Sequence, residues 1–207
     1  MSTKPLALAA SIALAIIAAA CATATTVPSY RAEALTIIKR DFKPHGQAEL
    51  ARLDVDPVLA LCNQTGNTPS AGIAHRMQDE LLATVQYPAD GVLMGDWQKG
   101  ETLAQDSRGL TWSDDPAQPA GGGCYNCHQI GPSEIAYGTL GPSLYQIGKL
   151  RGNTPETQKY IYSKIYNAKA YNLCSAMPRF GHAGVLTPEQ IKDLVALLLD
   201  PASPVNQ

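Results

Sequence analysis

The feature that most constrains this chain is a five-residue segment, Cys124-Tyr125-Asn126-Cys127-His128. On a helical turn, side chains three residues apart face the same way, so both thiols point to one side. Each thiol can form a thioether bond to a vinyl group of haem, and the imidazole that follows is placed to bind the iron. Gly121-Gly122-Gly123 precedes the segment and allows a sharp turn into it. C-x-x-C-H is the attachment motif of c-type haem, so we expect one covalently bound haem c.

The cysteine pair has two other interpretations. A structural zinc site requires four ligands, and Cys62, Cys174 and His182 are available to complete one. A redox-active C-x-x-C is expected beside a βαβ pattern, which this sequence lacks. The histidine directly after the second cysteine favours haem over both.

Haem iron takes a second axial ligand unless its site is open. The candidate ligands are Met77, Met94, Met177, His45, His75 and His182. Met177 is preferred because it lies in a loop, residues 174–181, just before the last predicted helix, where Pro178 stiffens the chain. A thioether sulfur favours ferrous iron and raises its reduction potential. A core position is the commoner use of methionine and is the alternative for Met177.

A second segment is predicted to orient the proximal histidine. Gly141-Pro142-Ser143-Leu144 begins shortly after the haem motif. We expect a carbonyl near Pro142 to accept a hydrogen bond from the imidazole nitrogen of His128 that does not bind iron. Such bonds fix the ring orientation and tune the metal. An ordinary turn is the alternative.

Residues 1–24 have the three parts of a secretory signal: a basic start at Lys4, an apolar run, and small residues at a cleavage site. The run is shorter than the roughly 20 residues of a spanning helix, and no later run is long enough to span. Cys21 leaves lipid anchoring as an alternative, although the large aliphatic residue expected three places before it is absent. The sequence therefore predicts a periplasmic protein with no membrane span.

Export places the remaining cysteines in an oxidising compartment. Beside the two of the haem motif these are Cys62 and Cys174, which we expect to form a disulfide. Such a bond would connect the leading segment to the loop that carries Met177. A free thiol and a bond to a partner protein are the alternatives.

Hydrophobic periodicity predicts an all-α fold, since no segment has a convincing strand pattern. The predicted helices cover residues 32–42, 71–85 and 96–104, one that starts at 154, and one that starts after Thr187. Thr187, Pro188 and Gln190 form a capping box with proline at the first helical position. Residues 113–123 are predicted to be a loop. We expect a helical N-terminal extension, residues 25–90, packed on a main domain, residues 91–207.

Composition and charge exclude two classes of protein. The chain is 45% hydrophobic, too apolar for a disordered protein, and its net charge of −2 excludes nucleic-acid binding through a general basic surface. Residues 149–179 are mainly basic and residues 101–134 mainly acidic. Two solvated faces are the simpler interpretation, and a dipolar electron carrier is the alternative. Lys149 or Arg151 is a candidate partner for a haem propionate.

Taken in order, several segments resemble a class I cytochrome c over about residues 91–201. They are Gly95-Asp96-Trp97-Gln98-Lys99-Gly100-Glu101, the C-Y-N-C-H motif, Gly141-Pro142-Ser143-Leu144, the Met177 loop and the closing helix. Further segments resemble the SoxX family of small cytochrome subunits, namely 145–152 (YQIGKLRG), 176–181 (AMPRFG) and 200–205 (DPASPV). The long insertion between the first helix of the domain and C-x-x-C-H is also similar to that family.

The resemblance implies the electron-transfer subunit of the SoxAX complex, which oxidatively joins thiosulfate to a cysteine of the carrier SoxYZ. The reacting haem belongs to the partner SoxA, and the SoxX subunit passes electrons to a downstream acceptor. Carried over, Cys124 and Cys127 hold the haem, His128 and Met177 bind its iron, and no residue of this chain is catalytic. The alternatives are a free periplasmic electron shuttle and a haem enzyme or sensor with an open iron site. The leading segment favours a subunit, because a shuttle does not need extra interface.

Overall fold

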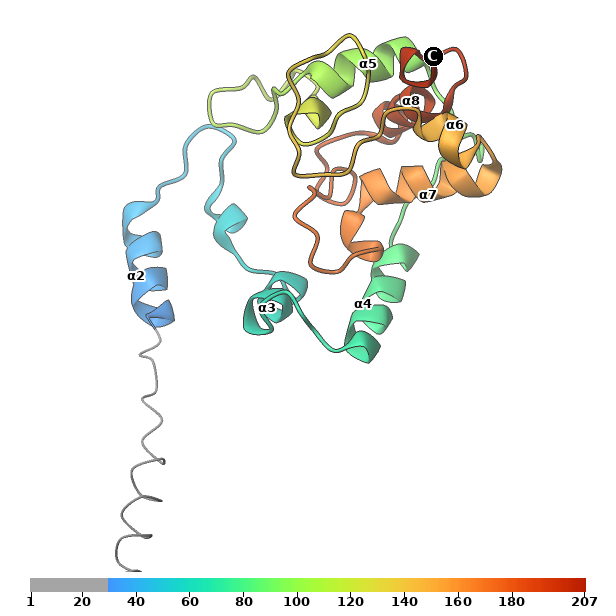
Figure 1. Cartoon of the computed structure of the whole chain (residues 1–207). Coiled ribbons are helices and arrows are strands. Elements are labelled where there is room, and N and C mark those ends of the chain that lie inside the picture. Colours follow the sequence, from blue (N-terminus) through green and yellow to red (C-terminus); the bar gives the residue numbers. More distant parts are fainter. Residues whose placement is uncertain (1–29) are drawn as a thin grey trace, which may run out of the picture. The chain divides into compact units, whose positions relative to one another are not determined.

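The computed structural model describes residues 30–207 (Figure 1). The predicted signal segment, residues 1–24, and Cys21 lie outside the described residues. The chain divides into two units, Met1–Phe42 and Lys43–Gln207. The described helices are α2 (Arg31–Asp41), α3 (Pro57–Gln64), α4 (Ala71–Ala83), α5 (Trp97–Gln105), α6 (Ile147–Arg151), α7 (Pro155–Tyr166) and α8 (Pro188–Leu199). Short 3₁₀ turns cover Leu50–Leu53, Cys124–Asn126, Ala168–Ala170 and Pro204–Asn206. Between residues 30 and 207 no strand forms, and the one β-bridge joins His45 and Ala48.

The first unit contributes α2 to the described residues. This helix forms where periodicity predicts one, with its ends shifted by one residue. None of its residues is buried, and Leu35 and Phe42 are 37% and 53% exposed.

Helix α8 anchors the core of the second unit and matches its prediction closely. Thr187 caps the helix with both hydrogen bonds of the capping box, and Pro188 occupies the first position. The apolar residues at helical spacing along it are all buried: Ile191, Leu194, Val195 and Leu198. The capped start and the continuous apolar face explain why local sequence sufficed to predict this helix.

Helices α5 and α8 pack against each other (Figure 1). Gly100 lies at their contact, where a Cβ would come within 2.2 Å of the backbone oxygen of Asp193. The side chain of Asp193 also accepts a hydrogen bond from the backbone N–H of Asp96, the N-cap of α5. A glycine and an acidic side chain therefore fix the approach of these helices.

Helix α7 begins after its N-cap Thr154, where a helix is predicted to start, and also packs on α8. Its inner face includes the buried Ile161 and Ile165. Tyr162 is fully buried as well, and its hydroxyl donates a hydrogen bond to the backbone oxygen of Gln86, 3.0 Å away. This bond ties the segment after α4 to the main core.

Two helices of the second unit were not predicted. Helix α3 begins with Pro57, after the N-cap Asp56, and buries Val58 and Cys62. Helix α6 has five residues and follows Gln146, which has a left-handed backbone conformation. Both helices are too short to show a clear apolar period.

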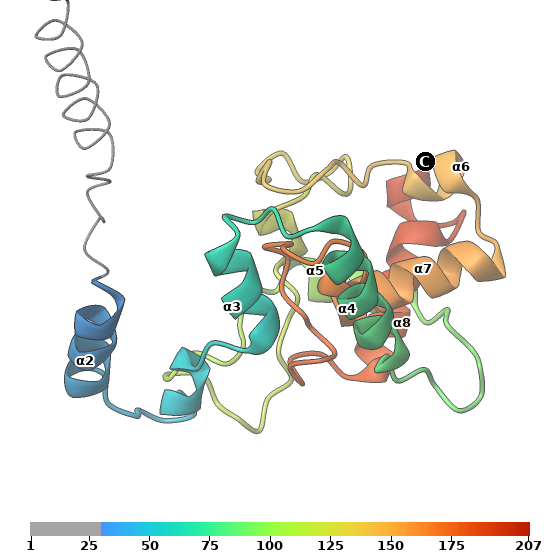
Figure 2. The same ribbon diagram turned by 90° about the horizontal axis from the view of Figure 1, so that it is seen from below.

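Helices α3 and α4, whose ribbons Figure 2 shows from a second side, share a small apolar cluster with Leu173 and Cys174, separate from the main core. The expected extension, residues 25–90, therefore includes α2 in the first unit and α3 and α4 in the second. No helix in the described range is long and apolar enough to cross a bilayer.

Candidate haem site

An apolar cleft in the second unit is lined by Cys124, His128 and Met177. The other residues that line it carry hydrocarbon side chains: Ala104, Ile130, Leu144, Ile165, Phe180, Leu194, Leu197 and Leu198. About 370 Å³ of empty space lies between them, including the open mouth. Helices α5, α7 and α8 thus form the apolar walls of the cleft. One thiol, one thioether and one imidazole also line it.

The haem motif is a tight turn, as its glycines predict. Gly123 has a left-handed backbone conformation, with φ of +54°. The backbone N–H groups of Cys127 and His128 both donate to the carbonyl oxygen of Cys124, at 3.1 and 2.9 Å. Cys127 is partly buried and does not line the cleft, whereas Cys124 does.

Tyr125, between the two cysteines, is buried and holds the motif in place. Its hydroxyl donates to the carboxylate of Glu101 on α5 at 3.0 Å and accepts from the backbone N–H of Gly131 at 3.0 Å. Burial, and then the charge of Glu101, raises the pKa of Tyr125, so this hydroxyl stays protonated. Sequence reasoning missed this role, because nothing local distinguishes the tyrosine from a variable position of the motif.

The imidazole of His128 is oriented by the backbone beside it. Its Nδ1 lies 2.7 Å from the carbonyl oxygen of Pro142. Because a carbonyl only accepts, Nδ1 carries the proton, and the lone pair of Nε2 is left to bind a metal. Gly141 passes so close that a Cβ there would lie 2.1 Å from Cε1 of the ring. Glycine at 141 is therefore required by the histidine's position.

Among the six candidates for the second axial ligand, Met177 is the one that lines the cleft with His128. The other candidates lie in different surroundings. Met77 packs on the α3–α4 cluster and Met94 on the main core. The ring of His45 packs edge-on against Trp112, and both His75 and His182 are exposed.

The structure weakens the zinc interpretation of the cysteine pair, and the surroundings of Cys124 do not favour the redox one. Cys62 and Cys174 form the expected disulfide, with their Cα atoms 5.6 Å apart, so neither is available as a zinc ligand. Residues 30–207 contain no cluster of three or more His, Cys, Asp or Glu side chains that could hold a metal. Burial, and then the nearby Cys127, raises the pKa of the Cys124 thiol to about 12, whereas redox-active thiols have lowered values.

Several charged side chains of the two segments are exposed, as solvated faces require, among them Lys149, Arg151, Lys159 and Asp115. Lys169 is an exception, and Asp106 has a local partner. Lys169 is buried, and its Nζ donates to the backbone oxygens of Leu173 and Ser175 at 3.3 and 3.0 Å. Asp106 forms an ion pair with Arg108, which lowers the pKa of the carboxyl to about 2. Neither Lys149 nor Arg151, the candidate propionate partners, lines the cleft.

Comparisons with known proteins agree with this geometry. Residues 98–200 match the family model of cytochrome c, so this region is a cytochrome c domain. A protein from Aquifex aeolicus (strain VF5), described as an uncharacterised lipoprotein, is 44% identical over 131 residues. That match covers 62% of this chain and 61% of the relative's length. The domain implies a haem c cofactor and electron transfer, and the apolar cleft with its thiol, imidazole and thioether fits such a group.

Proposed function

We propose that this protein is an electron-transfer cytochrome c in which Cys124 and Cys127 hold one haem c, and His128 and Met177 bind its iron. The observation that carries the proposal is the convergence of Cys124, His128 and Met177 on one apolar cleft. A sulfur and an imidazole nitrogen are a ligand pair found in cytochromes c.

The haem supplies one-electron chemistry at iron, and the chain supplies ligands, orientation and exclusion of water. The Pro142 carbonyl fixes the tautomer and orientation of His128. The hydrocarbon side chains of α5, α7 and α8 keep water from the site, which disfavours the more highly charged ferric state. The Met177 sulfur acts in the same direction, so a high reduction potential is expected.

Replacement of Met177 tests the ligand assignment. The ferric holoprotein should show the far-red charge-transfer absorption of a methionine–iron bond, and Met177→Ala should abolish it. Met94→Ala is the matched control, since Met94 is partly buried outside the cleft, and should retain the band. Absence of the band from the unsubstituted protein would contradict the assignment and favour an open iron site.

The finer proposal is that the chain is the electron-transfer subunit of a SoxAX thiosulfate-oxidising complex, with SoxA as its partner and SoxYZ as the substrate carrier. The segments that resemble the SoxX family support it, as do α3 and α4, which precede the matched cytochrome region. Exposed apolar side chains near the haem motif, Ile135 (90%) and Leu140 (88%), are suited to a protein interface.

A free periplasmic shuttle is the alternative function, and reduction of the haem distinguishes the two. In the purified complex, thiosulfate together with reduced SoxYZ should reduce this chain's haem, and omission of either should prevent it. A shuttle would instead be reduced by a different donor, in the absence of SoxA. Haem reduction that needs neither SoxA nor the carrier would contradict the subunit proposal.

We also propose that the protein is exported. The signal pattern of residues 1–24 supports export, and the name of the Aquifex relative strengthens the alternative of a lipid anchor on Cys21. Cys21→Ser decides between the two forms. If Cys21 is lipidated, the substitution moves the protein from the membrane fraction to the soluble fraction, and if the signal is cleaved after residue 24, it changes nothing.

A further inference from the structure

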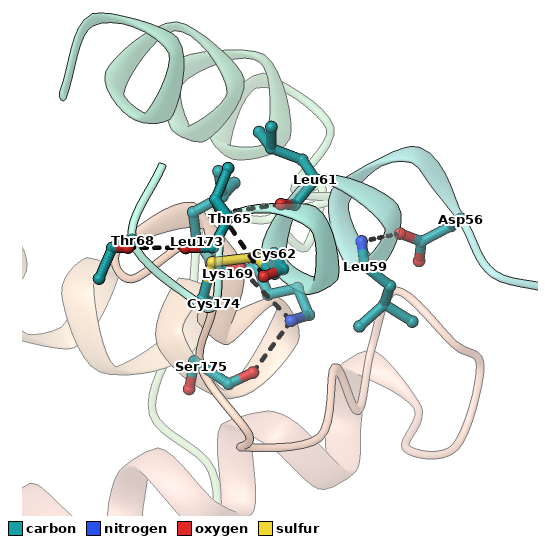
Figure 3. Close-up of a disulfide and its surroundings, with 10 residues drawn as sticks. All are labelled: Asp56, Leu59, Leu61, Cys62, Thr65, Thr68, Lys169, Leu173, Cys174 and Ser175. Atoms are coloured by element: carbon teal, nitrogen blue, oxygen red, sulfur yellow. Dashed lines mark hydrogen bonds between the residues drawn. A yellow bond between two sulfur atoms is a disulfide. The ribbon is translucent and has the colours of Figure 1, made fainter. Parts of the chain in front are cut away.

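The Met177 segment, residues 174–179, is bonded to helix α3 on both sides of the methionine. On the N-terminal side, the Cys62–Cys174 disulfide joins it to α3, across a sequence separation of 112 residues (Figure 3). On the C-terminal side, Nη2 of Arg179 lies 2.5 Å from Oδ2 of Asp56. One anchor therefore ends on α3 and the other on Asp56, the residue that caps α3.

Asp56 has two roles at the start of α3. Its Oδ1 accepts a hydrogen bond from the backbone N–H of Leu59 at 2.9 Å, which caps the helix, while Oδ2 receives Arg179. The side chains of Asp56 and Arg179 are 30% and 20% exposed, so this ion pair is better shielded than a surface pair. The helix cap and the anchor of the Met177 segment are thus one carboxylate.

Hydrogen bonds around Cys174 and Met177 add to these anchors. Lys169 donates to the carbonyl oxygens of Leu173 and Ser175, on either side of Cys174 (Figure 3). The hydroxyl of Ser175 accepts a hydrogen bond from the backbone N–H of Met177 at 3.2 Å. Backbone on the N-terminal side of Met177 is therefore fixed by a buried ammonium and a hydroxyl as well as by the disulfide.

We propose that α3 is a positioning element for the iron site, which holds Met177 in place as a ligand through Asp56–Arg179 and Cys62–Cys174. This inference rests on the proposed ligation by Met177. A neutral thioether is displaced whenever its loop opens locally, and the frequency of opening depends on how the loop is anchored. Anchors on both sides of Met177 keep its effective concentration at the iron high.

Imidazole added to the ferric holoprotein measures this opening, because it binds the iron only when Met177 has left. Asp56→Asn keeps a good helix cap and removes the charge that holds Arg179. We expect imidazole to bind this variant about fivefold more tightly than the unsubstituted protein, and Cys62→Ser/Cys174→Ser more tightly still. Asp41→Asn, which breaks the exposed Arg40–Asp41 ion pair of α2, is the matched control and should bind imidazole unchanged.

The far-red band and chemical unfolding, recorded on the same samples, separate the possible results. Tighter imidazole binding in Asp56→Asn than in Asp41→Asn, in a folded protein that keeps the band without imidazole, supports the inference. Equal imidazole affinity in all variants that keep the band overturns it and leaves Met177 ligation intact. A band absent from the unsubstituted protein overturns the ligand assignment itself, and with it the role of α3. If the double serine variant does not fold, the imidazole affinity of Asp56→Asn alone still tests whether α3 positions Met177.

Discussion

Tyr125 is the residue that connects the haem motif to its surroundings, through Glu101 on α5 and the backbone of Gly131. Tyr125→Phe removes both hydrogen bonds and leaves the N–H of Gly131, which is buried, without a partner. We expect the free energy of unfolding of the holoprotein to fall by about 1–3 kcal/mol. Urea unfolding followed by circular dichroism measures it.

The matched control is Tyr137→Phe, which removes a hydroxyl from a side chain that is 40% exposed. Its effect should stay within about 0.5 kcal/mol, as for most surface substitutions. Equal stabilities for the two variants would show that the bonds of Tyr125 do not hold the motif in place.

The haem motif could be predicted from sequence because haem attachment dictates residue types at fixed local spacing. Met177 could be predicted from its place in a proline-containing loop before the last helix, and Pro142 from its place shortly after the motif. Tyr125 and Gly141 were not, because their roles depend on atoms of Glu101 and His128 that only the fold brings near. Lys169 was interpreted as part of a charged face, whereas the fold buries it and its ammonium donates to the carbonyl oxygens of Leu173 and Ser175.

At the scale of helices, the packing of α5 on α8 depends on Gly100. In Gly100→Ala the added methyl carbon would meet the backbone oxygen of Asp193 at 2.2 Å, so the helices would have to move apart. We expect a loss of about 1–3 kcal/mol in the free energy of unfolding, typical of overpacking. Denaturant unfolding of the holoprotein measures it.

Gly72→Ala in α4 is the control, because no atom outside its own helix lies within 4 Å of the added carbon. Alanine is the better helix former, so this change should stabilise the protein by up to about 1 kcal/mol. Destabilisation of similar size in both variants would contradict the role assigned to Gly100.

Helices α5, α7 and α8, which begin after side-chain caps, were predictable from sequence, as were α2 and α4. Helices α3 and α6 were not, since eight and five residues give too few turns for a period. The one available signal for α3 was Asp56 followed by Pro57, a good cap and first position. The contact between α3 and the Met177 segment could not be predicted from the apolar pattern, because the two are distant along the chain.

Across the whole molecule, the disulfide makes α3 part of the same structural unit as the haem site. In the chain-entropy model a loop this long, closed across 112 residues, stabilises by up to about 5 kcal/mol. Helix α3 therefore supports the cytochrome c domain although it lies outside the matched residues.

The Asp56–Arg179 pair makes the free energy of unfolding depend on pH. Burial raises the pKa of Asp56, but the N–H of Leu59 and the guanidinium of Arg179 lower it more, so the net pKa is below its ordinary value. The charges of Lys169 and Asp56 also interact. Burial, and then Arg179, lowers the pKa of His182, so this imidazole adds no positive charge near Asp56 at pH 7. A carboxyl whose pKa is lower in the folded protein stabilises the fold at pH values above its ordinary pKa. This contribution to the free energy of unfolding is lost as the pH falls through the pKa of the folded state.

Asp56→Asn should therefore be less stable than the unsubstituted protein at pH 7, by about 1 kcal/mol for a partly shielded pair. The difference should shrink below about pH 4 and vanish once the carboxyl is protonated. Urea unfolding at pH 7 and pH 3 measures both values. A difference that persists unchanged at pH 3 would show that the charge of Asp56 is not what stabilises the fold.

The most direct test of the account is purification of the native protein, with haem staining of the separated chains. We predict that this chain stains for covalently bound haem and co-purifies in constant ratio with a second haem-staining chain. A protein that stains but elutes alone at every salt concentration would contradict the subunit proposal. A chain that does not stain would contradict the central claim that Cys124 and Cys127 hold a haem.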